Sequence, residues 1–523
     1  MSSKKSKLPL ILVVLDGWGI DKVNRGNAIK LAKTPFINEL TQKYPYTTLK
    51  AHGKYVGLPK GQVGNSEAGH VNIGAGRIVE QDSVKISKSI ANGTFYKNSA
   101  FMGAIRHVRK MKSKFHLIGM LSNGQSPHSD PGHLYALLEL LKKNKIDNVC
   151  LHIFTDGRDS PQYASMSLIE KLEKRLADNE KIATVAGRFY AMDRKKKWER
   201  TALVYEALTK GKGRQATSAQ EAITEAYNRG ESDEFIEPYI IKQPLKINTR
   251  IEDKDSVVFF NLRSDRGRQL SKAFVQNDFN KMNPSAFKRG KKFDHLYFTA
   301  MTDFGPDLDD ILTAYPSIDL KDALPFQLKE LSQLYLAETE KYAHVSFFFN
   351  GGYSGTVVGE DQLMIASPDV RSYDTTPGMS TDKLSQQVLR NLRLSNKNNW
   401  KYDFTLLNIA APDMVGHTGN LKAAIKTCKI VDKNIKKIVE AYLKINGTVI
   451  ITADHGNIEK MINLETNEIY TEHTTNPVPF VFVNNSLKDK TLKENGVLGD
   501  IAPTVLKVLN IIKPKAMDRK PLF

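Results

Sequence analysis

Carboxylate and imidazole side chains recur near both ends of this chain, in short segments that also contain glycine. The candidates are Asp16 and Ser66 near the start, and Asp413, His417, Asp454, His455 and His473 near the end. Mixed carboxylate and imidazole ligands without thiolate suit manganese, zinc or a similar divalent ion. A single Asp–His pair is usually an ordinary hydrogen-bonded feature, but several such groups at the ends of strands favour metal ligation.

Ser66 lies in a glycine-rich segment, Gly64-Asn65-Ser66-Glu67-Ala68-Gly69-His70. We expect a loop there, in which backbone amides could approach an anion closely. A serine in such a turn is seldom a nucleophile by itself. A neighbouring divalent metal lowers the pKa of a hydroxyl group and so supplies a nucleophile at neutral pH. The metal argument therefore makes Ser66 the candidate nucleophile.

The middle of the chain holds three short motifs that combine arginine with aspartate. They are Asp156-Gly157-Arg158-Asp159, the segment from Arg188 to Arg194, and the segment from Asn261 to Arg266. Arginine binds carboxylate and phosphate oxygens through two parallel hydrogen bonds, so converging arginines suit a small substrate that carries both groups. For any one arginine, a surface Arg–Asp ion pair is the simpler interpretation. Three such motifs at or near strand ends favour a pocket.

Six apolar runs have the length of β-strands and end in polar or acidic residues. They are Leu10–Leu15, Phe115–Met120, Val149–Phe154, Val257–Leu262, Phe404–Ile409 and Thr448–Thr452. Because polar residues do not alternate along them, they predict strands buried on both faces, as in parallel sheets covered by helices. Helical patterns between them, such as Leu134–Leu141 and Ile425–Leu443, complete the prediction of an α/β fold. Functional residues collect at the carboxyl ends of such strands, where Asp16, Asp413 and Asp454 stand.

The position of the candidate ligands also predicts the domain organisation. If both ends of the chain supply one metal site, they must fold into one domain, and the middle must be an inserted second domain. At 523 residues the chain also exceeds what one hydrophobic core usually supports. We place the crossings near residues 78–82 and 303–309. The prediction is a discontinuous metal-binding domain of residues 1–79 and 310–523, with an inserted α/β substrate-binding domain of residues 80–309.

The composition, with 41% hydrophobic and 25% charged residues, is that of a soluble globular protein. Its apolar runs are shorter than the roughly 20 residues needed to span a bilayer, so no membrane segment is predicted. A net charge of +19 invites a nucleic-acid interpretation. However, the lysines are spread along the chain without a recognised motif, and an anionic small substrate explains a positive field equally well. Cys150 and Cys428 are too few for a disulfide framework, which indicates a reducing cytoplasm.

Taken together, these motifs resemble the cofactor-independent, that is 2,3-bisphosphoglycerate-independent, phosphoglycerate mutases of the alkaline phosphatase superfamily. The resemblance covers nearly the whole chain and rests on Val14–Gly19, Gly64–Arg77, Asp156–Asp159, Gly187–Arg194, Asn261–Arg266, Ala337–Tyr342, Asp413–Gly419, Thr452–Asn457 and His473–Pro479. The chain departs from the family pattern in Ser122–Asp130, which has an extra residue. It also has Tyr353 where the family usually has a glutamate.

The resemblance implies an alkaline phosphatase-like domain built from both chain ends, with the insertion as a phosphotransferase domain. It implies two manganese ions, with other divalent ions as alternatives. The implied ligands are Asp16, Ser66, Asp454 and His455 for one ion, and Asp413, His417 and His473 for the other. The implied catalytic residues are Ser66 as the phosphoryl-accepting nucleophile, Lys341 as a charge stabiliser, and Asp159 as acid or base at the glycerate hydroxyls. The implied substrate-binding residues are His128, Arg158, Asp159, Arg188, Arg194, Arg263 and Arg266.

The activity implied by the resemblance is the interconversion of 3-phosphoglycerate and 2-phosphoglycerate in glycolysis and gluconeogenesis. It would run through a phosphoserine without 2,3-bisphosphoglycerate, in a cytoplasmic monomer with no nucleic-acid or membrane partner. Two rivals are a metal-dependent phosphatase or other phosphomutase of the same superfamily, and a non-catalytic basic protein that binds nucleic acid. The arginine motifs weigh against the first rival, and the metal ligands weigh against the second.

Overall fold

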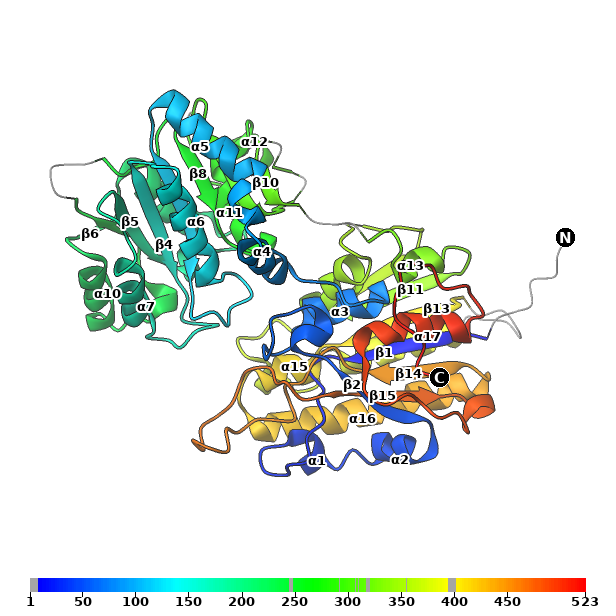
Figure 1. The fold of residues 1–523 in the computed structure, drawn as a ribbon. Coiled ribbons are helices and arrows are strands. Elements are labelled where there is room, and N and C mark those ends of the chain that lie inside the picture. The colour runs from blue at the N-terminus through cyan, green and yellow to red at the C-terminus, as the bar shows by residue number, and fades with distance from the viewer. Residues whose placement is uncertain are drawn as a thin grey trace. The chain divides into compact units, whose positions relative to one another are not determined.

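The computed structural model describes residues 8–243, 248–290, 292–305, 307–308, 310–316, 320–353, 355–393 and 401–523. The chain divides into two compact units, residues 1–81 with 318–523 and residues 82–317, called here the first and the second unit. Each contains an eight-stranded sheet among its described residues, with helices packed on it, so the predicted α/β fold class is confirmed (Figure 1). The sequence predicts domain boundaries after residues 79 and 309, and the structure divides the chain after residues 81 and 317. Pro306 and Asp309, in the second predicted crossing, lie outside the described residues.

The sheet of the first unit has the strand order β12-β11-β13-β1-β14-β15-β2-β16. In that order the strands are Asp361–Ile365, Gln333–Glu338, Phe404–Ile409, Leu10–Leu15, Thr448–Thr452, Val478–Val483, Tyr46–Lys50 and Gly496–Val497. Strand β1 lies between β13 and β14 and is parallel to both, with Leu10 opposite Phe404 and Thr448. The two ends of the chain therefore build one sheet.

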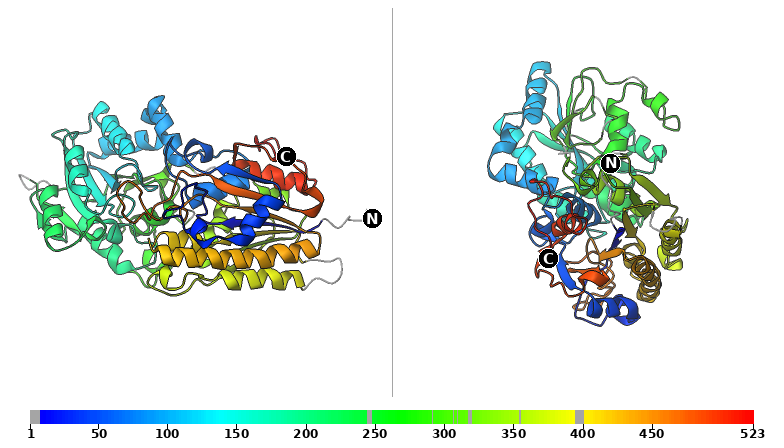
Figure 2. Two further views of the ribbon diagram at one scale, coloured as in Figure 1. Left: turned by 90° about the horizontal axis from the view of Figure 1, so that it is seen from below. Right: turned by 90° about the vertical axis from the view of Figure 1, so that its right-hand side faces the viewer.

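The helices of the first unit form two layers, one on each face of this sheet (Figure 1). The helices are α1 (Ala28–Ala32), α2 (Pro35–Lys43), α3 (Ser66–Ala75), α13 (Leu324–Gln327), α14 (Thr381–Arg393), α15 (Ala411–Gly416), α16 (Leu421–Lys444) and α17 (Ile501–Val508). Helices α1, α2 and α16 lie on one side, and α3 and α17 lie on the other. Helix α16 buries Cys428, Val431 and Ile435 at intervals of one helical turn, and α14 runs beside it (Figure 2).

The second unit has the strand order β10-β9-β8-β3-β4-β5-β7-β6. In that order the strands are Leu312–Tyr315, Tyr297–Thr302, Ser256–Phe259, Phe115–Leu121, Val149–Thr155, Glu180–Gly187, Tyr239–Ile241 and Arg214–Ala216. Its helices are α4 (Asp82–Ala91), α5 (Ser99–Met111), α6 (Pro131–Lys143), α7 (Ser165–Glu173), α8 (Arg188–Ala191), α9 (Trp198–Lys210), α10 (Ala219–Asn228), α11 (Ser264–Val275) and α12 (Phe279–Met282). Successive residues along β3, such as Leu117 and Ile118, enter separate cores on the two faces of the sheet.

All six predicted strands are present, and β1, β13 and β14 have the predicted bounds. Strand β8 ends at Phe259 rather than Leu262. Its ladder stops because the side chain of Asn261 accepts a hydrogen bond from the backbone of Met120, and the backbone N–H of Leu262 bonds to His128. The sheets are also not wholly parallel, since β15 pairs antiparallel with β14 and β2, and β7 pairs antiparallel with β5. A continuous apolar run does not encode strand direction.

The expectation of a loop around Ser66 was wrong, because helix α3 begins at this residue. The Asn65 side chain caps the helix by accepting a hydrogen bond from the backbone N–H of Ala68 at 2.9 Å. Gly69 serves close packing rather than a turn, since a Cβ atom there would lie 2.7 Å from the Cβ of Asp454. The glycine-rich composition therefore marks a helix pressed against the candidate metal ligands.

Two further predictions concern the whole chain. Cys150 and Cys428 are both buried and free, as expected for packing residues. Among the described helices, none combines the length and the apolar character needed to cross a membrane.

Candidate functional site

The seven predicted metal ligands all lie in the first unit, at one end of its central strands. Asp16 directly follows β1. Asp413 lies on α15, which follows β13, and His417 lies just after that helix. Asp454 and His455 lie two and three residues after the end of β14. Ser66 begins α3, and His473 stands in the segment before β15. Ligand atoms within 4.8 Å of one another form three overlapping groups among the described residues: Asp413, His417 and His473; Asp16, Asp413 and His455; and Asp16, His70 and Asp454. The structure thus brings together residues from both chain ends.

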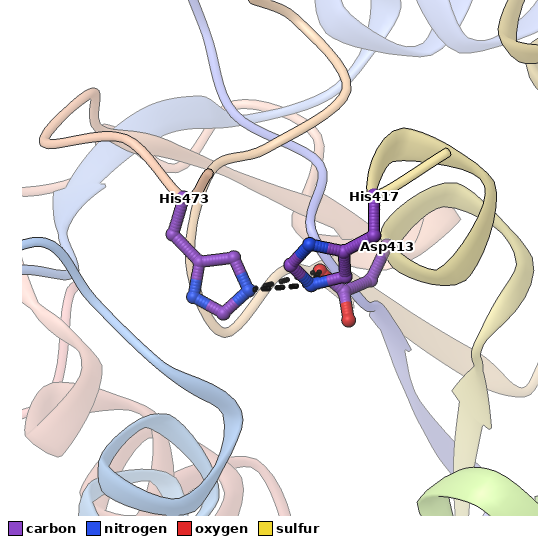
Figure 3. A group of neighbouring side chains, drawn as sticks. All are labelled: Asp413, His417 and His473. Carbon is purple, nitrogen blue, oxygen red and sulfur yellow. Dashed lines mark hydrogen bonds and ion pairs between the residues drawn. The ribbon is translucent and has the colours of Figure 1, made fainter. Parts of the chain in front are cut away.

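Asp413, His417 and His473 direct one ligand atom each toward a common point (Figure 3). The Nε2 atoms of His417 and His473 lie 3.3 and 3.2 Å from Oδ1 of Asp413 and 3.0 Å from each other. Each Nδ1 lies 2.8 Å from a backbone carbonyl, that of Thr471 or of Gly64, and donates its hydrogen there. Both Nε2 lone pairs therefore face each other and the carboxylate, an arrangement that fits a cation.

Asp16, Ser66, Asp454 and His455 form a second group, which is almost wholly buried. The Oγ of Ser66 lies 3.2 Å from Oδ1 of Asp16 and 2.9 Å from Nε2 of His455. That Nε2 lies 3.6 Å from a carboxylate oxygen of Asp16 and 3.6 Å from one of Asp454. The Oδ2 of Asp454 is buried and receives no hydrogen bond among the described residues. A buried carboxylate oxygen without a donor is costly, so this group also fits a cation.

Lys341 connects the two groups. It lies in a short 3₁₀ helix, Thr339–Lys341, directly after β11. Its Nζ donates to Oδ1 of Asp16 at 2.6 Å, to Oγ of Ser66 at 2.7 Å and to Oδ2 of Asp413 at 2.7 Å. Burial acts to lower the pKa of Lys341, but Asp16, Asp413 and Asp454 outweigh burial and raise it. Lys341 is therefore a charged ammonium group next to the candidate nucleophile.

Electrostatics favour the ionised form of the carboxylates in this site. Burial acts to raise the pKa of Asp413, but Lys341 and His417 overcome it and hold the pKa well below its usual range. The pKa of Asp454 is likewise lowered, because His455, His70 and Lys341 outweigh burial. Both carboxylates are thus anionic at neutral pH, as candidate metal ligands should be.

Three residues that support the ligands were not singled out from the sequence. Asn408 Nδ2 donates to Oδ2 of Asp16 at 2.7 Å and to Nε2 of His70 at 3.1 Å. His70 Nε2 is therefore an acceptor, and Nδ1 donates to the backbone carbonyl of Ser66 at 2.8 Å, which makes His70 a supporting residue rather than a ligand. Asn457 Nδ2 donates to Oδ1 of Asp413 at 2.9 Å. The available signals were weak: a polar residue late in an apolar run, and a histidine one helical turn after Ser66.

The second unit holds a buried arginine between two aspartates. Nη1 of Arg188 lies 2.5 Å from Oδ1 of Asp156 and 2.5 Å from Oδ2 of Asp159. Ser126 donates to the same Asp159 oxygen at 3.1 Å, and Nε2 of His128 lies 4.0 Å from it. Burial acts to raise the pKa of Asp159, but Arg188 and Ser126 lower it. Asp159 is therefore held ionised in a fixed orientation.

The remaining predicted arginines add further positive charge near this group. Burial, together with Arg263, Arg188, Arg266 and Arg194, lowers the pKa of His128 well below its usual value. Burial, Arg188 and Arg194 also lower the pKa of Arg266 to about 9. Such mutual perturbation indicates a cationic cluster suited to an anionic ligand.

Three of these arginines also have acidic partners, and the Nη2 of Arg263 lies 3.4 Å from Oδ2 of Asp265. Arg194 pairs with Asp265 at 2.5 Å, and Arg158 pairs with Glu234 at 2.7 Å and is about half exposed. Arg158 thus forms an ion pair in this structure, and its role in binding substrate stays a prediction.

Comparison with known proteins places this geometry in a family. Residues 8–513 match the model of the metalloenzyme superfamily. The 2,3-bisphosphoglycerate-independent phosphoglycerate mutase of Clostridium kluyveri is 46% identical over 521 residues, 99% of each chain, and enzyme 1 of that name from Methanosarcina acetivorans is 46% identical over 525 residues, also 99% of each. The structure of Leishmania mexicana phosphoglycerate mutase at low cobalt concentration superposes with a TM-score of 0.84 at 28% identity, over 100% of this chain and 98% of that one. The chain therefore belongs to the 2,3-bisphosphoglycerate-independent phosphoglycerate mutases, within the metalloenzyme superfamily.

Proposed function

We propose that this protein interconverts 3-phosphoglycerate and 2-phosphoglycerate through a phosphoserine at Ser66, with two divalent metal ions and without 2,3-bisphosphoglycerate. The observation that carries the proposal is the position of Ser66 at the first residue of α3. Its Oγ lies among Lys341, His455 and Asp16 at 2.7, 2.9 and 3.2 Å. Full-length relatives that bear the name of this mutase support the same activity.

Each ligand group fits a divalent cation. We propose one ion held by Asp16, Ser66, Asp454 and His455, and another held by Asp413, His417 and His473. The Oδ2 of Asp454, which accepts no hydrogen bond among the described residues, and the facing Nε2 atoms of the two histidines support this assignment. When bound, the ions would act as Lewis acids that lower the pKa of the serine hydroxyl and offset charge on the phosphoryl group. We propose Mn²⁺, with Co²⁺ or another divalent ion as alternatives.

In the proposed mechanism, Ser66 is the nucleophile that attacks phosphorus. Its Oγ forms a bond to the phosphoryl group as the bond from phosphorus to the glycerate oxygen breaks, and that oxygen takes up a proton. The Lys341 ammonium donates to Oγ and so stabilises the negative charge of the attacking oxygen. The start of α3 adds its N-terminal partial positive charge, which favours an anionic group at this position. The reverse transfer, to the other glycerate hydroxyl, completes the isomerisation.

In the second unit, we propose that the arginine cluster binds the carboxylate and the phosphate of the substrate. Guanidinium groups suit both anions, and the mutual repulsion of Arg188, Arg194 and Arg266 is relieved when an anion binds. His128, Arg158 and Arg263 complete the proposed set. Asp159, kept ionised by Arg188, would accept the proton of a glycerate hydroxyl and return it to the leaving oxygen.

An enolase-coupled assay on 3-phosphoglycerate, with and without Mn²⁺ and without 2,3-bisphosphoglycerate, tests the proposal. We expect Mn²⁺-dependent activity in the wild type and its loss in Ser66→Ala. Undiminished activity of Ser66→Ala would contradict the phosphoserine, and phosphate release without isomerisation would favour a phosphatase. We further propose a monomer that acts in the cytoplasm on this small-molecule substrate, which sedimentation and cell fractionation would test.

A further inference from the structure

Glu459 joins three of the segments that carry the proposed metal ligands. Its Oε2 accepts hydrogen bonds from the backbone N–H groups of Gly19 at 3.0 Å and Asn457 at 2.8 Å. Its Oε1 accepts from Nδ2 of Asn476 at 3.0 Å and from the hydroxyl of Thr474. The four donors follow Asp16, His455 and His473 in the chain by one to three residues. One carboxylate thus contacts the three strand-end segments that must converge on the ions.

The environment of this carboxylate is unusual for a buried acid. Glu459 is 1% exposed, and within the described residues it forms no ion pair with lysine, arginine or histidine. Buried carboxylates usually have a cationic partner, because burying an unpaired charge is costly. Here four hydrogen bonds satisfy the two oxygens instead. Because both oxygens of Glu459 accept hydrogen bonds, the carboxylate restricts the positions of its four donor groups as well as its own orientation.

The backbone of two neighbouring segments packs closely against the Glu459 carboxylate. A Cβ atom at Gly19 would lie 2.3 Å from Oε1 of Glu459, and one at Gly456 would lie 2.4 Å from the same oxygen. Both glycines therefore allow the segments to approach the carboxylate. Asn457 extends the contact to the other ligand group, since its backbone bonds to Glu459 while its side chain donates to Oδ1 of Asp413.

We propose that Glu459 is a positioning residue, which fixes the spacing of the segments bearing Asp16, Asp454, His455 and His473 in the geometry that binds the two metal ions. This inference rests on the metal sites of the proposed function and adds a residue that touches neither ion nor substrate. In Glu459→Gln, the amide nitrogen would face one pair of hydrogen-bond donors and force that segment away. Loss of such supporting partners typically weakens metal binding about 10- to 100-fold, and we expect a loss in this range.

The first unit contains a matched control. Glu360 is also buried, at 4% exposed, and its carboxylate accepts hydrogen bonds from Asn350, Gln362 and the backbones of Val357 and Val358. It therefore resembles Glu459 in burial and hydrogen bonding, but its partners carry no proposed ligand. Glu360→Gln reports the effect of weakening a buried carboxylate network without disturbing the metal site.

The test is Mn²⁺ titration of the chelator-stripped full-length chain, read by calorimetry and by the electron paramagnetic resonance signal of free Mn²⁺. We expect Glu459→Gln to bind Mn²⁺ about 10- to 100-fold more weakly than wild type, and Glu360→Gln to keep wild-type affinity. Wild-type affinity in Glu459→Gln, or an equal loss in both variants, would overturn the proposal.

A milder variant keeps the test decisive if Glu459→Gln does not fold. Thr474→Val retains the carboxylate and removes one donor, so we expect a roughly twofold to tenfold loss of Mn²⁺ affinity, and no loss would overturn the proposal. A wild type that binds Mn²⁺ but does not isomerise phosphoglycerate would overturn the proposed function alone. A wild type that binds no divalent ion would overturn both.

Discussion

The ammonium group of Lys341 donates a hydrogen bond to the Oγ of Ser66 over 2.7 Å, at a point where both side chains are almost wholly buried. The same ammonium contacts one carboxylate from each ligand group, Asp16 and Asp413. Because these neighbours raise the pKa of Lys341, its charge persists throughout the neutral range. Lys341 can therefore stabilise the charge of an attacking oxygen but cannot act as a base toward Ser66.

Replacing Lys341 with methionine, which has a similar length and no charge, isolates this electrostatic contribution. We expect kcat to fall roughly 100- to 1000-fold with a much smaller change in KM, as when one preorganised donor is removed from an active site. Steady-state kinetics in the enolase-coupled assay measure both constants. Lys114→Met is the control, because Lys114 is also a buried lysine paired with acids, Glu252 and Asp255, in the second unit. A Lys341→Met enzyme with kcat within a factor of two of wild type would contradict the assigned role.

Metal removal is expected to destabilise the first unit as well as to stop catalysis. Without cations, the buried Oδ2 of Asp454 accepts no hydrogen bond among the described residues, and Nε2 of His417 and His473 face each other at 3.0 Å. Mn²⁺ at 100 times its Kd would add about 2.7 kcal/mol of stability per site. Scanning calorimetry should show a lower Tm in chelator and recovery on adding Mn²⁺, and His417→Ala should show a smaller recovery. A Tm that is insensitive to chelator would argue against ligation.

The sequence was sufficient to predict the α/β fold class, because runs such as Leu10–Leu15 and Phe404–Ile409 are mainly apolar without alternation and become central strands. Asp16, Asp413 and Asp454 could also be singled out as candidate metal ligands, since each stands a few residues after such a run. Strand direction could not be read, because Val478–Val483 would look the same in either orientation. Helix α3 was missed because glycine predicts a turn unless the surface that packs against it is known.

The supporting residues of the metal site could not be predicted for a different reason. Glu459 and Gly19 are 440 positions apart in the chain, and Asn408 and Asp16 are 392 apart. Nothing local to either residue indicates its partner, so only the folded sheet reveals the contact. Composition identifies groups that can bind metal, whereas the hydrogen bonds that orient them depend on tertiary structure.

A buried arginine and an exposed arginine of the second unit should respond differently to substitution. Arg188 is 2% exposed and pairs with Asp156 and Asp159, so Arg188→Met leaves buried charge unpaired and should cost about 3–5 kcal/mol of unfolding free energy. Arg194 forms a solvent-exposed pair with Asp265, worth at most about 1 kcal/mol, so Arg194→Met should mainly raise KM. Urea unfolding and steady-state kinetics separate these effects. Equal losses of stability in the two variants would contradict the distinction.

A chain of buried polar groups in the second unit should make stability depend on pH. His116 Nε2 lies 3.1 Å from Oδ2 of Asp255, His116 Nδ1 lies 3.0 Å from Nε2 of His152, and His152 Nδ1 lies 3.0 Å from the hydroxyl of Thr184. Burial lowers the pKa of His116 although Asp255 opposes it, and burial and His116 lower the pKa of His152 well below its usual value. Both imidazoles are therefore neutral in the folded protein at pH 7.

Because the unfolded chain binds protons on these histidines near pH 6.5 and the folded chain does not, stability is retained above that pH and lost as pH falls below it. Each histidine contributes a slope of at most about 1.4 kcal/mol per pH unit. His152→Gln removes one titrating group, so urea unfolding between pH 8 and pH 5, in excess chelator, should show a shallower decline than wild type. An unchanged slope in His152→Gln would show that this histidine is already protonated, or titrates alike, in the folded and unfolded chains.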